Sequence, residues 1–470
     1  MAIFDYSKND DDAFDAIATF ERYLQEGEPV FLESYAYERI VQHYTEEGEW
    51  DKAEIAIDWA MQFHPFCFEL RIARVRVFAA IKDYETTMQA LEECEQLQPL
   101  DPEVKLVRGN VMMAYGYFKE AREDYQKAVS EAPDNPQALY ALGYVSQCLA
   151  EYPEAIERFK ATLIIDDSFE DAALDLIHCT LVVDKLDQSI QFFEKRLDSD
   201  PYAGSYWMYL GIARFEQREW KKASRAFEYA TITESDNGMA YERLGHALMN
   251  QKKFEEAALA YESAIEVQGE QASLYCHLGA SYEKQDDYRR AYRFYRKAKD
   301  LDQLHANAWF GMASCLIEKE QWMEAINFLK KAISINRHSA DFWLSLGIAE
   351  NALSNYQACE EAFGQASAIG GENADIWLRW SMIHYQQGNL KRALEIVCDG
   401  LDELPDNPDL NYSACAYYLY HGEYQKAFYY LEVGLHLDYE RHEMLYEMFP
   451  SNTMKKAIAR LVREIVSDGI

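Results

Sequence analysis

The stretch YLGIARFEQREWKKA, residues 209 to 223, places Leu210 beside Gly211, a large ring at Trp220 and a small residue at Ala223. A glycine inside a helical pattern costs roughly 1 kcal/mol relative to alanine, so it needs a packing reason. Spacings of three and four residues put Trp220, Ala223 and Phe227 on one helical face. We interpret the stretch as the seam where the two helices of a pair pack closely together.

The same pattern recurs every 34 residues along the chain. A small residue stands in register in each of twelve units: Ala53, Thr87, Ala121, Ala155, Ser189, Ala223, Ala257, Ala291, Ala325, Cys359, Ala393 and Ala427. A large apolar residue lies three positions before each of them and another lies four positions after. The sequence therefore predicts an array of helix pairs, with helix A over unit positions 2 to 14, a turn near position 15, and helix B from about 17 to 30.

Composition supports an all-α protein and narrows its partners. Proline and glycine are sparse, at 11 and 21 residues, and runs of alternating β-branched residues are missing. The formal net charge is −35, which repels the phosphates of nucleic acid and anionic membranes. We therefore expect no nucleic acid and no membrane among the partners. The opening residues lack the pattern of a secretory signal, and we expect a cytoplasmic protein.

Unit 204 to 237 carries a known set of residues at fixed unit positions: Trp207, Leu210, Gly211, Ala223, Phe227 and Ala230. In this it resembles the tetratricopeptide repeat (TPR) family, with departures at Arg214 and Ser235. The resemblance covers residues 34 to 441, and the chain is similar to all-repeat bacterial TPR proteins of unassigned function. It implies an α-solenoid, a right-handed superhelix of about twelve helix pairs with the A helices on its concave side.

Three regions follow from this interpretation. Residues 1–33 are expected to form an acidic segment and an N-terminal capping helix, residues 34–441 the twelve repeats, and residues 442–470 the C-terminal capping helices. Caps are needed because a terminal repeat would otherwise expose an apolar face to water. The basic closing helix and a basic stripe at Arg289 are interpreted as solvated surfaces.

Motifs that carry chemistry are missing from the sequence. It contains no GxxxxGK[ST], HExxH or GxSxG motif. The adjacent pairs His178-Cys179 and Cys276-His277 point in different directions on a helix, so they make poor metal sites. We expect no catalytic residue, no metal and no cofactor. The protein is therefore predicted not to be an enzyme.

The resemblance implies that unit positions 2, 5, 9, 12 and 13 of helix A face a groove. Position 5 offers no lysine, which argues against the family's clamp for a C-terminal carboxylate. Position 9 gives a polar ladder in units two to five, at Arg76, Asn110, Tyr144 and His178. In later units the groove is expected to be mainly apolar and to bind a partner through Met208, Ile212, Phe215, His246, Met249, Phe310, Ile317, Leu344, Asn351, Leu378 and Tyr385.

Two other interpretations stay open for these residues. The apolar side chains could pack each helix A against the next unit, and the polar ladder could simply be solvated. For the whole protein, we expect a scaffold that binds a peptide or helix of a partner protein. The acidic charge of the scaffold would favour a basic segment, and its apolar groove an amphipathic one. The alternatives are a structural solenoid that self-associates and a regulatory subunit of an enzyme complex. The sequence leaves the oligomeric state open.

Overall fold

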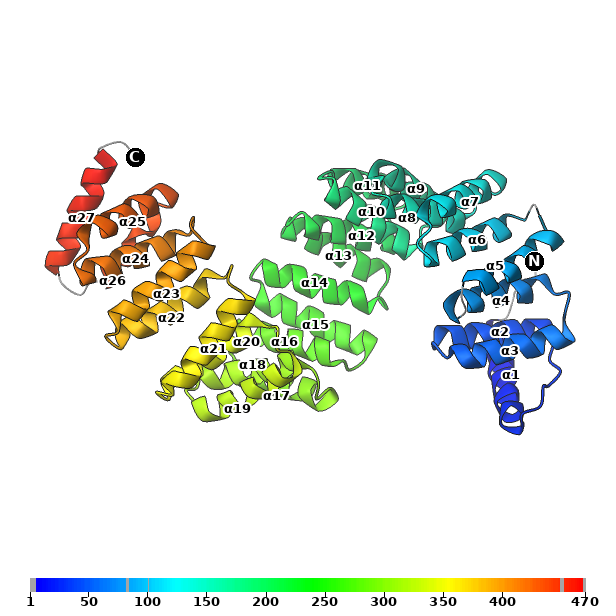
Figure 1. Ribbon diagram of the computed structural model, residues 1–470, viewed down its shortest axis with the longest axis horizontal. Helices are drawn as coiled ribbons and strands as arrows, with labels where there is room; N and C mark the ends of the chain where they lie inside the picture. Colours follow the sequence, from blue (N-terminus) through cyan, green and yellow to red (C-terminus); the bar gives the residue numbers. More distant parts are fainter. Residues whose placement is uncertain (1–5, 82–83, 100, 449–451, 468–470) are drawn as a thin grey trace. The chain divides into compact units, whose positions relative to one another are not determined.

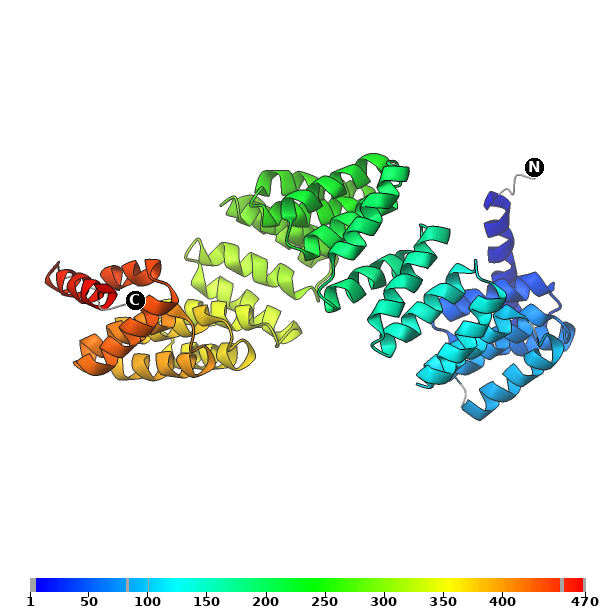
Figure 2. The ribbon, with the colours of Figure 1, turned by 90° about the horizontal axis from the view of Figure 1, so that it is seen from above.

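The computed structural model describes residues 6–81, 84–99, 101–448 and 452–467. Every regular element in these ranges is a helix. The chain divides into two compact units, one ending at Glu234 and the other beginning at Ser235. Within each unit, successive helices lie side by side in antiparallel pairs, as Figures 1 and 2 show. None of the described helices is long and apolar enough to cross a membrane.

The first unit begins with α1 (Tyr6–Glu26) and continues as six helix pairs. The first helices of these pairs, the A helices, are α2 (Ser34–Glu46), α4 (Phe68–Ile81), α6 (Pro102–Ala114), α8 (Pro136–Cys148), α10 (Glu170–Val182) and α12 (Gly204–Glu216). The second helices, the B helices, are α3 (Trp50–Phe63), α5 (Tyr84–Leu97), α7 (Phe118–Glu131), α9 (Tyr152–Ile165), α11 (Asp187–Ser199) and α13 (Trp220–Thr233).

The second unit has the same construction. Its A helices are α14 (Gly238–Asn250), α16 (Ala272–Glu283), α18 (Ala306–Ile317), α20 (Ala340–Ala352), α22 (Ala374–Gln386) and α24 (Pro408–His421). Its B helices are α15 (Phe254–Gln268), α17 (Tyr288–Leu301), α19 (Trp322–Ile335), α21 (Tyr356–Ile369), α23 (Leu390–Glu403) and α25 (Tyr424–Leu437). The short helices η1 (Glu440–Glu443) and α26 (Met444–Met448) follow, and then α27 (Asn452–Ser467).

The A helices begin every 34 residues, from Ser34 to Pro408, which confirms the predicted period of helix pairs. Each begins at unit position 1, one residue earlier than expected, a difference within the ordinary fraying of helix ends. The three-part division into residues 1–33, 34–441 and 442–470 stays a prediction. The helix expected within residues 1–33 is α1, Tyr6–Glu26, and within residues 442–470 the structure describes helical residues 442–448 and 452–467.

The turn between the helices of a pair is alike in every repeat whose position 15 is described, and in the second repeat that position, residue 82, lies outside the described residues. Position 15 takes a positive φ whether or not it is glycine: φ is 80° at Gly116 and 59° at Ala150. The next residue then donates its backbone N–H across the helix end, as Tyr117 does to the carbonyl of Met112 at 2.8 Å. These bonds satisfy helix carbonyls that would otherwise lack a partner.

The seam predicted from Gly211 is a site of close contact between a helix backbone and a ring. A Cβ atom built on Gly211 of α12 would lie 2.5 Å from Cε1 of Phe227 on α13, whose side chain is fully buried. Gly143 and Phe159 repeat this contact in the fourth repeat. The twelve small residues that define the period are all buried, which places them between packed helices.

Candidate functional site

The A helices of successive repeats contact one another and form one continuous face in each unit. In the first unit these contacts join α2 to α4, α4 to α6, α6 to α8, α8 to α10 and α10 to α12. Unit position 9 falls on this A-helix face. The face therefore carries the residues that the sequence assigns to a groove.

The A-helix face of the first unit contains a hollow of about 730 Å³. Its lining comes from α4, α6, α7, α8 and the segments before α8 and α10: Arg76, Glu103, Leu106, Asn110, Met113, Tyr125, Asn135, Gln137, Tyr140, Ala141, Tyr144 and Phe169. Three residues of the predicted polar ladder, at 76, 110 and 144, thus come together around one cavity. We call this cavity the tyrosine hollow.

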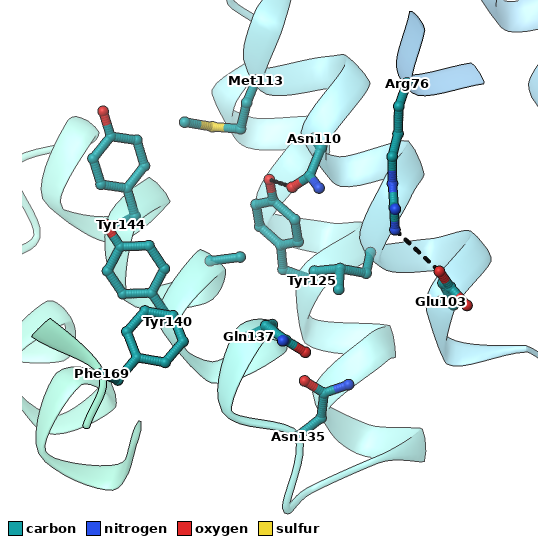
Figure 3. Close-up of a pocket in the computed structure, with 12 residues that line it drawn as sticks. Arg76, Glu103, Asn110, Met113, Tyr125, Asn135, Gln137, Tyr140, Tyr144 and Phe169 are labelled. Carbon is teal, nitrogen blue, oxygen red and sulfur yellow. Dashed lines mark hydrogen bonds and ion pairs between the residues drawn. The ribbon is translucent and has the colours of Figure 1, made fainter. Parts of the chain in front are cut away.

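One wall of the tyrosine hollow is aromatic. The rings of Tyr140 and Tyr144 stack with centroids 6.1 Å apart, and Tyr140 also packs against Phe169 at 4.9 Å. Figure 3 shows these three rings in a column opposite Tyr125 and Asn110. The Tyr140 hydroxyl donates to Asp175 at 2.9 Å, which fixes the central ring. Burial raises the pKa of Asp175 above its usual range.

The opposite wall carries polar groups in fixed positions. The buried Tyr125 donates its hydroxyl to Oδ1 of Asn110 at 2.7 Å, so the amide nitrogen of Asn110 stays available as a donor. Asn135 and Gln137 add two more amide groups at the floor in Figure 3. Rings beside amides suit a peptide, because its side chains need apolar contact and its backbone needs hydrogen bonds.

A second hollow of about 500 Å³ adjoins the first on the same face. Arg76 and Glu103 line both hollows, and their side chains pair at 3.0 Å between Nη2 and Oε1. The second hollow, the acidic hollow, is lined by Glu38, Val41, Gln42, Thr45, Glu46, Glu69, Ile72, Ala73, Arg76, Val77 and Glu103. The two cavities therefore form one groove along α2, α4, α6 and α8.

Like charges meet in the acidic hollow. Burial, together with the nearby carboxylate of Glu69, raises the pKa of Glu38 above its usual value. A cationic side chain placed between these two carboxylates would relieve that repulsion. The acidic hollow is therefore suited to a lysine or arginine of a partner.

His178 is separated from the other ladder residues. It is exposed on α10 and does not line the tyrosine hollow. The sequence prediction contains only Arg76, Asn110 and Tyr144 of the twelve residues that line this hollow, and it missed the other nine, among them Glu103, Tyr125 and Phe169. Glu103 stands at groove position 2, and Tyr125 is a tyrosine where several other repeats have phenylalanine, so the sequence contained a signal for these two.

The predicted apolar groove residues divide by burial. Met208 and Leu344 are only 5% and 8% exposed, so these two side chains pack between helices and we leave them out of the proposed surface. The others are partly buried: Ile212, Phe215, His246, Met249, Phe310, Ile317, Asn351, Leu378 and Tyr385. Several of these also pack within the protein, as Phe310 does on Phe342 with ring centroids 4.8 Å apart.

A smaller hollow of about 310 Å³ lies on the A-helix face of the second unit. It is lined by Ile348, Asn351, Leu378, Arg379, Met382 and Ile383 of α20 and α22, and so contains two of the predicted residues. The remaining predicted residues of this unit do not line it. It offers room for a single side chain rather than for a length of chain.

Two groups of side chains with metal-ligating atoms occur among the described residues: Glu242, His246 and His277, and Glu38, Cys67 and Glu69. Sequence reasoning, which considered only adjacent His and Cys pairs, expected no metal site and missed the first group. Its signal is the spacing of four between Glu242 and His246, which puts both on one face of α14. His277 joins them from α16, and that step depends on the fold.

Comparisons with known proteins identify the repeat. The family model described as tetratricopeptide repeat matches residues 208–273, and the model described as anaphase-promoting complex, cyclosome, subunit 3 matches residues 250–332. No curated protein matches the chain.

Solved structures with a similar arrangement include three proteins. The APC/C hetero-tetramer Cut9-Hcn1 is 14% identical over 87% of this chain and 94% of that chain, with a TM-score of 0.43. YrrB, a TPR protein with an unusual peptide-binding site, is 18% identical over 39% of this chain and 95% of its own, and MamA is 19% identical over 37% and 94%; both have a TM-score of 0.32. With its period, helix pairs and family match, the chain is built from repeats of the tetratricopeptide type.

Proposed function

We propose that the protein is a non-enzymatic scaffold for protein–protein interaction, and that the groove of its first unit binds an extended segment of a partner protein. The observation that carries this proposal is the pair of adjoining hollows of about 730 and 500 Å³ on one face, joined at Arg76 and Glu103. Their combined length along four A helices favours a length of chain over a small molecule.

The two hollows differ in chemistry, and this defines the partner. The tyrosine hollow favours a large apolar or aromatic side chain against Tyr140 and Tyr144, while its amides bind backbone. The acidic hollow favours a basic side chain near Glu38 and Glu69. The net charge of −35 would speed the approach of such a segment at low salt. The partner segment is therefore basic and amphipathic.

Selection from a random peptide display library on the full chain tests the proposal. Selected peptides are measured by fluorescence polarisation against wild type and against the groove variant Gln137→Ala plus Tyr144→Ala. Both side chains are exposed in the tyrosine hollow, and neither is the sole partner of a buried group. A matched control, Gln126→Ala plus Tyr202→Ala, removes the same residue types from exposed positions outside the hollow.

We expect the groove variant to weaken binding at least about tenfold, because truncating an aromatic anchor typically costs more than 1.4 kcal/mol. The control should leave affinity unchanged. Selected peptides should carry Lys or Arg and bind more weakly to Glu38→Gln plus Glu69→Gln. Peptides that bind the wild type and the groove variant equally would contradict the assignment of the groove.

Self-association is the second candidate, and one observation favours it. The B helix α25 exposes Tyr424, Phe428 and Tyr429 by 71%, 44% and 59%. A cluster of exposed aromatic side chains marks a contact surface more often than a single exposed aromatic side chain does. Light scattering at two concentrations, on wild type and on Tyr424→Ser plus Phe428→Ser, tests it. A mass that rises with concentration in the wild type alone would support self-association.

A further inference from the structure

The second unit holds a cluster of nitrogen and oxygen donors on α14 and α16. Glu242 and His246 lie one turn apart on α14, and His277 reaches them from α16. Oε1 of Glu242 lies 3.5 Å from Nδ1 of His277 and 3.7 Å from Nε2 of His246. One ligand atom from each of the three residues lies within 4.8 Å of the other two.

These separations match those of ligands around one metal ion. Donors bound to Zn²⁺ at about 2.0–2.1 Å in a tetrahedral arrangement lie about 3.4 Å apart. The observed 3.5 and 3.7 Å require only a small contraction. Two imidazoles and one carboxylate are also a donor set that Zn²⁺ accepts with a further position left for water. Two of the three donor separations are thus close to those around one metal ion, and the third, between a nitrogen of each histidine ring, is within 4.8 Å.

One ring nitrogen of the cluster is buried without a hydrogen bond. Nδ1 of His277 is buried and has no hydrogen-bond partner among the described residues. A buried nitrogen without a hydrogen bond is an unfavourable feature that a bound cation would remove.

A hydroxyl behind His246 completes the arrangement. The buried Tyr261 lies 2.9 Å from Nδ1 of His246 through its hydroxyl oxygen, and this oxygen can accept the Nδ1 proton and leave Nε2 free toward Glu242. Metal-binding histidines usually donate their second ring N–H in this way. Tyr261 reaches this position because residue 245 is glycine: a Cβ there would lie 2.5 Å from Cε1 of the tyrosine ring.

An ion could enter the cluster from solvent. The side chains of Glu242, His246 and His277 are 25%, 30% and 35% exposed, so the group lies at the surface of α14 and α16 rather than deep in the core. The His246 and His277 rings meet edge to face with centroids 4.6 Å apart.

We propose that Glu242, His246 and His277 bind a divalent transition metal ion of the Zn²⁺ class, with Tyr261 as a positioning residue for His246. The carboxylate supplies negative charge, the two imidazoles supply neutral nitrogen donors, and water fills the remaining position. The second donor group, Glu38, Cys67 and Glu69, is a weaker competitor. Its thiol donates to Glu69 at 3.2 Å, and burial raises the pKa of Cys67, so the thiolate that a metal needs is disfavoured.

Isothermal titration of the full, untagged chain with ZnCl₂ near pH 7.5 tests the proposal. The wild type should bind one tight equivalent. His246→Ala and His277→Ala should each weaken that equivalent at least about tenfold, and Tyr261→Phe should weaken it about tenfold through the loss of its hydrogen bond. Two controls should leave it unchanged: His178→Ala, which removes an exposed histidine, and Glu38→Gln plus Glu69→Gln, which removes the competing carboxylates.

A second measurement uses the wild type alone, so it does not depend on whether variants fold. Diethyl pyrocarbonate labels accessible histidines, and mass spectrometry locates the labels. Zn²⁺ should protect His246 and His277 and leave His178 labelled as before. The proposal is overturned if Zn²⁺ binds the double variant His246→Ala plus His277→Ala as tightly as the wild type, if binding is lost with Glu38→Gln plus Glu69→Gln instead, or if Zn²⁺ protects neither histidine.

Discussion

The contact between Gly211 and Phe227 predicts that the substitution Gly211→Ala destabilises the protein. An alanine Cβ at position 211 would lie 2.5, 2.6 and 2.9 Å from three atoms of the Phe227 ring. Ordinary carbon contacts need about 3.5–4.0 Å, so Gly211→Ala overlaps a fully buried ring by about 1 Å. Overpacking of this kind costs about 1–3 kcal/mol, while helix propensity returns about 1 kcal/mol. Because the overlap with a buried ring is about 1 Å, we take the upper part of this range, about 2–3 kcal/mol, and expect a net loss of about 1–2 kcal/mol.

Gly364 on α21 provides the matched control. It lies within a helix, and a Cβ built there meets no heavy atom within 4 Å. Gly364→Ala should therefore stabilise its repeat by about 1 kcal/mol through helix propensity alone. Glycine to alanine is thus predicted to lower the free energy of unfolding at position 211 and to raise it at position 364. The difference comes from the Phe227 ring beside Gly211.

Native-state hydrogen exchange is the appropriate assay, because long repeat arrays do not unfold in a single two-state step. Gly211→Ala should speed exchange in α12 and α13 about tenfold for each 1.4 kcal/mol lost, and Gly364→Ala should slow it in α21. Adding Phe227→Leu to Gly211→Ala should cost less than the two single losses summed, by about 1 kcal/mol. Equal protection in wild type and Gly211→Ala would refute the packing account of the repeat.

Three further predictions concern the turns, the acid stability and the thiols. Ala150→Gly should slow native-state exchange in α8 and α9 by an amount equal to about 1 kcal/mol, because Ala150 holds a φ of 59° that glycine adopts without strain. Although burial favours its neutral form, hydrogen bonds from Lys105 and Arg108 hold the pKa of Glu95 below its usual value. The stabilisation by ionised Glu95 is therefore complete above about pH 4.3 and is lost as pH falls through the folded-state pKa. Glu95→Gln should lower the local stability of α5 and α6 at pH 7 by about 1 kcal/mol, measured by native-state hydrogen exchange, and this difference from the wild type should shrink at acidic pH. Cys148 is the one cysteine classed as exposed, so Cys148→Ser should remove the fastest thiol reaction of the native protein with a disulfide reagent, while the six buried cysteines should react only after unfolding.

The period could be predicted from sequence because it reflects local geometry. On any helix, a ring, a small residue and a second ring at spacings of three and four residues lie on one face. The glycine on the facing helix is unfavourable in a helix interior unless it permits close packing. Phe227 and Gly211 satisfy this relation within one repeat. The helix starts at intervals of 34 residues follow from repeating that unit without a gap.

Exposure at the groove could not be predicted in the same way. Leu344 and Leu378 both stand at unit position 5, yet Leu344 is buried and Leu378 lines a hollow. The difference depends on the side chains of the next repeat: Leu344 joins the buried cluster that contains Trp377 and Trp380. The prediction that His178 shares a groove with the other ladder residues was wrong for a related reason. Several helices together form the walls of a cavity, and the position of a residue in its own helix does not show which other helices face it.

A buried tyrosine of helix B explains why the polar side chain at position 9 of helix A is fixed in some repeats. In the third and seventh repeats, Tyr125 and Tyr261 of helix B pass over Gly109 and Gly245, and their hydroxyls meet the position-9 side chains of helix A at 2.7 and 2.9 Å.

In the sixth and tenth repeats the same B-helix position is phenylalanine, Phe227 and Phe363, so that hydroxyl is missing, and position 9 is Ile212 or Ile348. The glycine therefore has a role beyond close packing, because it admits a ring whose far end orients a group on the opposite face. A group held in place before binding loses less entropy when it binds. Asn110 in the tyrosine hollow and His246 in the donor cluster are both held by a tyrosine hydroxyl in this way, and both repeats therefore present a fixed polar group to a ligand.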